Sequence, residues 1–196
     1  GWDVVNEAFE DDGSYRKSLY YKIIGPEFIE LAFRFAHEAD PNVELYYNDF
    51  GETDNIKSEG IIKLISDVKS AQGTRLDAFG MQAHYSVDSF SAAQFKTVAK
   101  KYAEAAGKVQ LTELDFQASA AYKSGAASKE SEYTKMAYCH KQLFDAAKDL
   151  KKNGTNVAGI TVWGVIEPNS WLHSQSNVGG GADGSKQCPL LFDGKY

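Results

Sequence analysis

Short apolar, β-branched segments alternate along the chain with longer segments of helical periodicity, and no hairpin turn joins two of the short segments. This order predicts a parallel sheet covered by helices, because parallel neighbours need a long crossover connection. The predicted strands are residues 2–5, 43–47, 76–82, 109–114 and 157–165, and the predicted helices are residues 26–39, 53–71, 91–106 and 129–152.

Two α/β architectures have this order of elements, the doubly wound sheet and the (β/α)8 TIM barrel. A doubly wound nucleotide-binding sheet has a glycine-rich turn after its first strand. Here the first strand is followed by Asn6, Glu7 and an acidic segment at 10–12, which repels phosphate. We therefore predict the TIM barrel. The glycine-rich segment 178–185 comes late, and we interpret it as a mobile loop.

The charge pattern bears on the partners of the chain. The 196 residues carry a net charge of −6 with no basic stripe, so neither nucleic acid nor an anionic membrane is an expected partner. No apolar run is long enough to span a membrane, and no leader opens the chain, so we expect any export signal to lie upstream. Cys139 and Cys188 have no metal-type spacing and are predicted to be free thiols.

Polar or aromatic side chains follow all five predicted strands. In a TIM barrel the carboxyl ends of the strands hold the active site. Each residue alone has a structural explanation, such as a turn, a core histidine or packing, but five coincident strand ends favour a site. The residues in question are Asn6, Glu7, Tyr47, Asn48, Asp49, Gln82, His84, Glu113, Asp115, Trp163, Glu167 and Trp171.

Glu7 and Glu113 are the natural pair of reacting carboxylates. Cleavage of a glycosidic bond needs one carboxyl group to protonate the leaving oxygen and another to meet the developing cation. The two strands lie three apart in barrel order, so the two side chains are expected to face each other across the mouth, about 5–6 Å apart. The acid is expected to have a raised pKa, and the nucleophile to be kept ionised by donors such as Asn6, Gln82 or His84.

Eight motifs in register carry a resemblance to a known family. They are Trp-Asp-Val-Val-Asn-Glu at 2–7, Asp-Asp-Gly at 11–13, Leu-Tyr-Tyr-Asn-Asp-Phe at 45–50, Phe-Gly-Met-Gln-Ala-His at 79–84, Leu-Thr-Glu-Leu-Asp at 111–115, Val-Trp-Gly-Val at 162–165, Ser-Trp-Leu at 170–172 and Pro-Leu-Leu-Phe-Asp at 189–193. The chain resembles glycoside hydrolase family ten, whose members include endo-1,4-beta-xylanases. The resemblance implies that Glu7 is the acid/base and Glu113 the nucleophile of a retaining enzyme.

The same resemblance implies roles for the other strand-end residues. Asn6 resembles the group that binds the sugar 2-hydroxyl, Gln82 and His84 the groups beside the nucleophile, and Asp115 the group that orients His84. Trp163 and Trp171 resemble the aromatic walls of the non-reducing side, and Tyr47 with Asn48 the platform on the leaving-group side. Glu167 stands where the family usually carries Asp, which is a departure in this loop.

The resemblance also implies that residues 1–196 form a single partial catalytic domain with strands four to eight. The first three strands and the last helix of the family barrel have no counterpart here. Both edge strands would be open, and open edges invite pairing. Expected partners are therefore xylan or xylo-oligosaccharides, together with the missing N-terminal barrel segment or a second copy of the chain. No cofactor is expected, and a polymeric substrate favours a secreted, periplasmic or cell-surface protein.

Two other functions remain open from the sequence. One is a catalytically inactive carbohydrate-binding fragment that keeps the cleft. The other is a metal-dependent barrel hydrolase that uses His84, Glu113 and Asp115, although these residues lack a metal-ligand spacing. The remaining histidines, His37, His140 and His173, fall on predicted helices or in a late loop, so no metal site is predicted.

Overall fold

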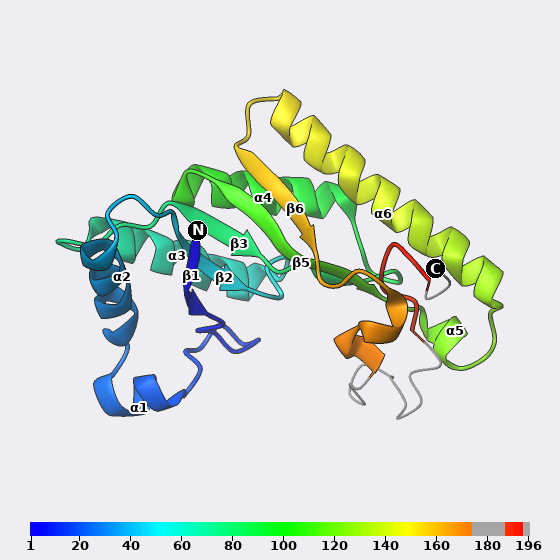
Figure 1. Cartoon of the computed structure of the whole chain (residues 1–196), viewed down its shortest axis with the longest axis horizontal. Helices are drawn as coiled ribbons and strands as arrows, with labels where there is room; N and C mark the ends of the chain where they lie inside the picture. The colour runs from blue at the N-terminus through cyan, green and yellow to red at the C-terminus, as the bar shows by residue number, and fades with distance from the viewer. Residues whose placement is uncertain (174–186, 194–196) are drawn as a thin grey trace.

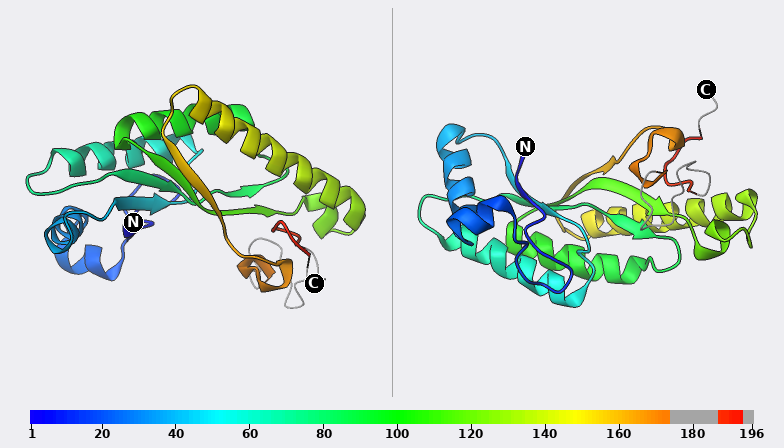
Figure 2. Two further views of the ribbon diagram at one scale, coloured as in Figure 1. Left: turned by 45° about the horizontal axis from the view of Figure 1, so that its top comes forward. Right: turned by 90° about the horizontal axis from the view of Figure 1, so that it is seen from below.

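The structure, a computed structural model, describes residues 1–173 and 187–193. A curved parallel sheet carries its larger helices on the convex face (Figures 1 and 2). The predicted glycine-rich loop at 178–185 lies outside the described residues. The strands are β1 (Trp2–Asn6), β2 (Leu45–Asp49), β3 (Ala78–Met81), β4 (His84–Ser86), β5 (Val109–Gln117) and β6 (Val157–Val162). The helices are α1 (Leu19–Ile24), α2 (Phe28–Ala39), α3 (Asn55–Ser70), α4 (Ala92–Ala106), α5 (Ala120–Lys123) and α6 (Lys129–Lys152).

All strand pairs in the sheet are parallel, as the order of elements predicts. The sheet runs β1-β2-β3-β5, and β4 and β6 also pair with β5. β3 lies within the third predicted strand, residues 76–82, whereas β4 begins at His84, beyond the predicted end, and was not predicted. The architecture is thus that of part of a (β/α)8 barrel, and this prediction is confirmed.

Side-chain caps begin five of the helices, and that of the short α5 is Ser119, which accepts from Tyr122 N. Ser18, Ser91 and Ser128 each accept a hydrogen bond from a backbone N–H of the first turn, and Asp54 accepts two. The four predicted helices are present. The helices α1 and α5 were not predicted, because six and four residues are too few to show helical periodicity. None of the described helices is long and apolar enough to cross a membrane.

The hydrophobic core lies between the sheet and α2, α3, α4 and α6. Aromatic side chains with no exposed surface fill it, among them Phe33, Tyr47, Phe79, Phe95 and Tyr102. Cys139 and Cys188 are buried free thiols, as predicted. Along β2, residues 45, 47 and 49 point into this core, so Tyr46 and Asn48 point to the concave side of the sheet.

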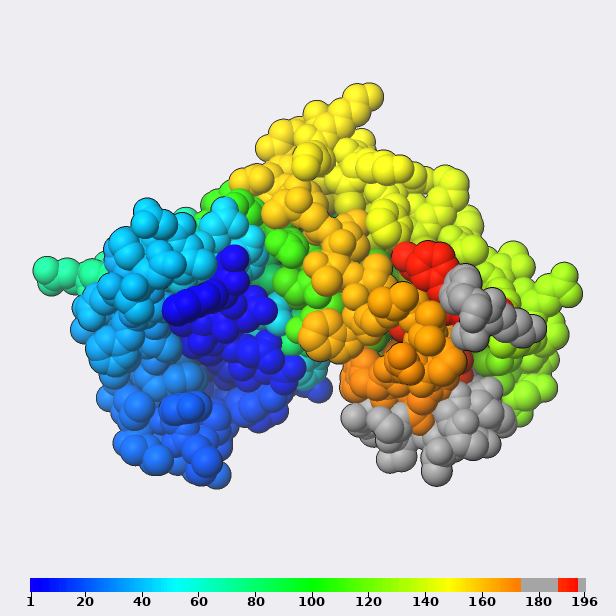
Figure 3. Space-filling view, in the orientation of Figure 1, coloured from blue at the N-terminus to red at the C-terminus, as the bar shows by residue number. Residues whose placement is uncertain are grey.

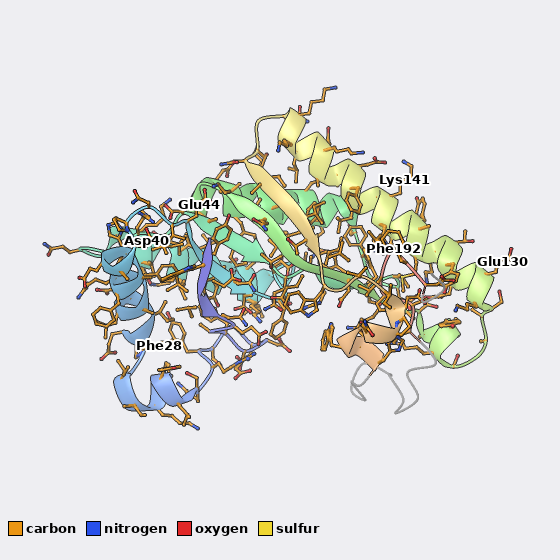
Figure 4. All side chains as sticks on the ribbon, in the orientation of Figure 1. Phe28, Asp40, Glu44, Glu130, Lys141 and Phe192 are labelled. Carbon is orange, nitrogen blue, oxygen red and sulfur yellow. The ribbon has the colours of Figure 1, made fainter. Side chains whose placement is uncertain are left out.

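The two edges of the sheet expose apolar surface. Trp2 on β1 is 47% exposed, and Trp163 after β6 is 46% exposed. A pocket of about 740 Å³ runs along β1, where it is lined by apolar residues of α1 and α2, Asn6, Glu7 and Arg16. Phe28, one of the lining residues, lies at the start of α2 (Figure 4). Within the described residues no strand covers this edge.

A β-bulge in β5 decides where Glu113 points. Between the register pairs Met81–Leu111 and His84–Asp115, β5 places residues 112–114 opposite only 82 and 83. In a regular strand Thr112 and Glu113 would face opposite sides. Here both contact Asn48, the threonine hydroxyl donating to Oδ1 at 2.7 Å and Glu113 Oε1 accepting from Nδ2 at 2.8 Å. The extra residue turns Glu113 to the concave side.

Two isoleucines of α3 provide a test of this packing. Ile65 has no exposed surface, whereas Ile56 is 64% exposed. We expect Ile65→Ala to lower the free energy of unfolding by about 2–5 kcal/mol, because it leaves a cavity in the core. Ile56→Ala is the matched control and should change it by less than about 0.5 kcal/mol. Urea denaturation measures both variants, and equal losses would contradict the described orientation of α3.

Candidate active site

The predicted polar residues meet where β1, β2 and β3 end, at the first residue of β4 and in the second half of β5. The surface is hollowed between the N-terminal segment and the residues that follow β6 (Figure 3). Asn48 Nδ2 donates to Glu113 Oε1 at 2.8 Å and to Asn6 Oδ1 at 2.9 Å. Gln82 Nε2 donates to Asn6 Oδ1 at 3.1 Å and to Glu7 Oε1 at 3.0 Å. Hydrogen bonds therefore link Glu7 and Glu113 at one rim of the sheet. The distance of about 5–6 Å between the two carboxyl groups stays a prediction.

Asn6 lies at the centre of this network. Its Oδ1 accepts from both Asn48 and Gln82, which fixes the orientation of the amide group. The opposite end of the amide, Nδ2, is then the donor that remains for an incoming ligand, and the residue is exposed. This geometry suits a donor to a sugar hydroxyl.

Glu113 and Asp115 lie on either side of the His84 imidazole. Nε2 lies 3.3 Å from Glu113 Oε2, and Nδ1 lies 2.8 Å from Asp115 Oδ1. Trp171 Nε1 donates to Asp115 Oδ2 at 2.7 Å, which completes the support of the ring. Burial lowers the pKa of His84, but the hydrogen bonds and charges of the two carboxylates outweigh it and raise the pKa to about 9. His84 is therefore a cation beside Glu113 at neutral pH.

Glu7 is held by two donors. Gln82 binds one carboxylate oxygen, and Arg16 Nη1 lies 2.7 Å from the other. Burial raises the pKa of Glu7, but the hydrogen bonds from Gln82 and Arg16 outweigh it, so the pKa lies below its ordinary value. This is the opposite of the raised pKa that was predicted for the acid, and the reasons are the hydrogen bond from the Gln82 amide and the contact with the Arg16 guanidinium on the β1–α1 loop.

Two predicted ligand contacts differ from the structure. Tyr47 has no exposed surface and faces the core, so it offers no platform for a sugar. The partly exposed aromatic residue beyond β2 is Phe50, whose ring lies 5.8 Å from the Arg16 guanidinium carbon. Gln82 lies beside Glu113, as predicted, because its backbone carbonyl accepts from Glu113 N at 3.1 Å, but its side chain contacts Glu7 and Asn6. The side chains that donate to the Glu113 carboxylate are Asn48 and His84.

The two tryptophans occupy different positions. Trp163 follows β6 with about half of its surface exposed, which suits stacking on a flat ring. Trp171 begins a short 3-10 helix, Trp171–His173, and its indole meets His84 edge-on with centroids 5.1 Å apart. Glu167, in the preceding 3-10 helix, is buried and accepts from the Tyr133 hydroxyl at 3.0 Å, so the substituted acid of this loop contacts α6.

Sequence reasoning missed Arg16 and Glu52. Arg16 lies nine residues after its partner in an irregular loop, and no periodic pattern marks it. Glu52 is almost fully buried, and its Oε1 accepts from Ala83 N at 3.2 Å and from the Tyr85 hydroxyl at 2.7 Å. It thereby supports the backbone between Gln82 and His84. An acidic residue just after a buried strand was the available signal.

A metal-dependent hydrolase would need a group of metal ligands at the site. Across residues 1–173 and 187–193, no three His, Cys, Asp or Glu side chains are grouped to hold a metal ion. The oxygens of Asp115 are already bonded to His84 and Trp171.

Comparison with protein families decides the assignment. Residues 1–196 match the family described as Glycosyl hydrolase family 10. The chain belongs to glycosyl hydrolase family 10. Endo-1,4-beta-xylanase A of Xylanibacter ruminicola is 39% identical over 212 residues, which cover 100% of this chain and 56% of that protein.

Solved family 10 structures share the fold. A novel GH10 endoxylanase retrieved from sugarcane soil metagenome superposes with a TM-score of 0.84 at 33% identity, over 98% of this chain and 57% of that structure. TsXylA, an intracellular xylanase from Thermoanaerobacterium saccharolyticum, gives 0.82 at 35% identity, over 99% and 53%. The chain thus spans about half the length of these relatives and forms part of the family 10 barrel.

The His84 ion pairs predict a pH dependence of stability for this family 10 chain. The folded-state pKa of about 9 exceeds the ordinary value of 6.5, so the contribution is fully present below about pH 6.5 and is lost as pH rises through 9. We expect the melting temperature to fall across this window. In His84→Gln, which cannot be protonated, the fall should be smaller. Thermal melts at pH 6.5 and 9.5 measure the difference, and parallel curves would contradict the charged assignment.

Proposed function

We propose that this family 10 chain carries the catalytic carboxylates of an endo-1,4-beta-xylanase that cleaves internal β-1,4-xylosidic bonds with retention. The observation that carries this proposal is the single hydrogen-bonded network joining Glu7, Asn6, Asn48 and Glu113 at one rim of a parallel sheet. Two carboxylates at one site are the requirement of glycosidic hydrolysis. Glu113 would attack the anomeric carbon while Glu7 protonates the leaving oxygen, and Glu7 would then deprotonate the attacking water.

The surroundings of the two carboxylates support these roles. His84 and Asn48 donate to Glu113 and orient the carboxylate that would act as the nucleophile. Both oxygens of Glu7 are engaged, by Gln82 and by Arg16, so a leaving oxygen must compete with one of these donors. The Arg16 contact favours ionised Glu7, the form that accepts a proton from water in the second step. In the first step Glu7 must be protonated, so this contact must weaken.

Xylan is the proposed substrate. Most of the relatives carry xylanase names, and Glu-to-Ala mutants of TsXylA were solved with xylotetraose and xylotriose. In this chain the exposed Trp163 ring can stack on a xylose face, and Asn6 Nδ2 can donate to a hydroxyl. Trp171 supports the site through Asp115.

The active form is proposed to have another polypeptide segment along β1. The 740 Å³ pocket there combines apolar residues of α1 and α2 with Asn6 and Glu7, so the site is open on this side. We propose the upstream barrel segment as the occupant of this pocket. The related structures superpose on nearly all of this chain, and about half of each lies outside the superposition. Pairing with a second copy of the chain is the other outcome, and native mass spectrometry separates the two.

A carbohydrate-binding role without turnover is the second candidate, favoured by the same open side. Calorimetry with xylohexaose and a reducing-sugar assay on xylan and cellulose, each with and without the upstream segment, distinguish the two functions. Binding without sugar release in both forms would support the binding role. A chelator in the same assay tests the metal-dependent alternative, which predicts loss of activity.

A location outside the cytoplasm, at the cell surface, in the periplasm or secreted, remains part of the proposal, because an intact polymer does not cross the membrane. TsXylA, in contrast, is described as intracellular. Fractionation of the source cells followed by immunodetection would decide between these locations.

Replacement of the nucleophile gives the sharpest test of mechanism. We expect Glu113→Ala to lower xylan hydrolysis on the order of 1,000-fold or more, because the covalent intermediate cannot form. Azide should restore turnover and give a glycosyl azide of inverted configuration. Glu104→Ala, on the exposed face of α4, is the control and should retain activity. Activity of Glu113→Ala without azide would refute the assignment.

The contact between Arg16 and Glu7 predicts a shift in the pH profile. Arg16 lowers the pKa of Glu7, so Arg16→Gln should raise it. The basic limb of kcat/KM reports loss of the acid proton from the free enzyme and should therefore move to higher pH. Arg75→Gln, which breaks contacts remote from the site with Asp77 and with the backbone carbonyls of Pro41 and Val43, should leave the limb in place. An unmoved limb in Arg16→Gln would show that Arg16 does not control the acid.

A further inference from the structure

The backbone at Glu7 has a conformation that side chains rarely adopt. Its φ is 56°, and Ala83 at 63° is the only other non-glycine residue with positive φ in the described part of the chain. Such a conformation persists only when its surroundings enforce it. At Glu7 it directs the carboxyl group to Gln82 and Arg16, so whatever enforces it also places the carboxyl group.

The Tyr47 hydroxyl binds the peptide group that follows Glu7. Ala8 N donates to this oxygen at 3.0 Å, and the hydroxyl in turn donates to the Asp49 carboxylate. The Tyr47 ring has no exposed surface and packs edge-on against Phe9 at 6.4 Å and stacked on Phe79 at 6.0 Å. The hydroxyl oxygen is therefore a fixed point.

A buried ion pair fixes the Asp49 carboxylate, which accepts from the Tyr47 hydroxyl. Lys57 Nζ, from the first turn of α3, lies 3.0 Å from Asp49 Oδ1, and neither side chain has exposed surface. Phe50 N also donates to Asp49 Oδ1 at 2.8 Å, and the Lys57 ammonium lies 3.5 Å from the Phe50 ring centroid. These contacts occupy Asp49 Oδ1, and the Tyr47 hydroxyl donates to Oδ2, so a lone pair of the hydroxyl faces Ala8 N.

We propose that Tyr47, held by Asp49 and Lys57, is the positioning residue that keeps Glu7 in its left-handed conformation and so aims the acid/base carboxyl group at the leaving oxygen. The inference rests on the proposed function of Glu7. Without the hydroxyl, Ala8 N loses its acceptor and the Glu7 backbone relaxes to negative φ. The carboxyl group then swings away from Gln82, and a displacement of about 1 Å at a reacting group is enough to cost roughly 100-fold in rate.

The test compares Tyr47→Phe with Tyr46→Phe. Both changes remove one buried hydroxyl from β2, but the Tyr46 hydroxyl bonds to Glu44 and Gln110, on the concave side. Aryl xylobiosides with good and poor leaving groups separate acid catalysis from general damage, because a good leaving group departs without protonation. We expect Tyr47→Phe to lower kcat/KM about 10- to 100-fold for the poor leaving group and less than about 3-fold for the good one. Tyr46→Phe should not lower kcat/KM more for one substrate than for the other. Equal losses of kcat/KM on both substrates in Tyr47→Phe would overturn the proposal.

Two readouts do not depend on turnover. In a carboxyl-carbon NMR titration, the pKa of Glu7 should move up towards its ordinary value in Tyr47→Phe, because the contacts with Gln82 and Arg16 are lost, and should stay in place in Tyr46→Phe. An unmoved Glu7 titration overturns the positioning role even if the chain hydrolyses no xylan, whereas absent hydrolysis by itself counts only against the proposed function. If Tyr47→Phe does not fold, amide exchange in the unaltered chain decides: an unprotected Ala8 N–H overturns the proposal.

Discussion

Glu7 and Glu113 lie at one rim of the sheet, where two carboxylates repel each other. The rest of the site depends on the hydrogen-bond donors that offset this repulsion. Each carboxylate has its own donors: Gln82 and Arg16 for Glu7, and Asn48 and His84 for Glu113. Because these donors come from different strands and loops, the network binds the strand ends together as it separates the charges. Asn6 accepts from both amides and lies between the two halves.

Rigid support for this network comes from charged groups buried beneath it. Asp49, Lys57 and Glu52 have almost no exposed surface, although such residues are rarely buried without partners. Each contacts a tyrosine hydroxyl, a backbone N–H or an opposite charge, so the desolvation cost is offset locally. They support the two left-handed positions, Glu7 and Ala83, where strain would otherwise move the functional side chains.

The predictions failed where a residue was assigned without its side-chain direction or its loop contacts. All five strands and the four long helices agree with periodicity, because one buried face leaves a repeating pattern. Tyr47 was assigned to the ligand on the family resemblance, yet alternation along β2 turns it to the core. Arg16, and with it the lowered pKa of Glu7, gave no signal, since an irregular loop has no periodicity to follow.

The sequence by itself determined the parallel order of elements, the family, and the set of polar residues at the strand ends, because buried strands, helix caps and short motifs are local in the chain. Only the tertiary structure decided which donor meets which carboxylate. Glu113 reaches Asn48 because a bulge in β5 reverses its side, and Glu7 reaches Gln82 because a buried tyrosine holds its backbone. These outcomes depend on register and on contacts between residues far apart in the chain, which no local pattern encodes.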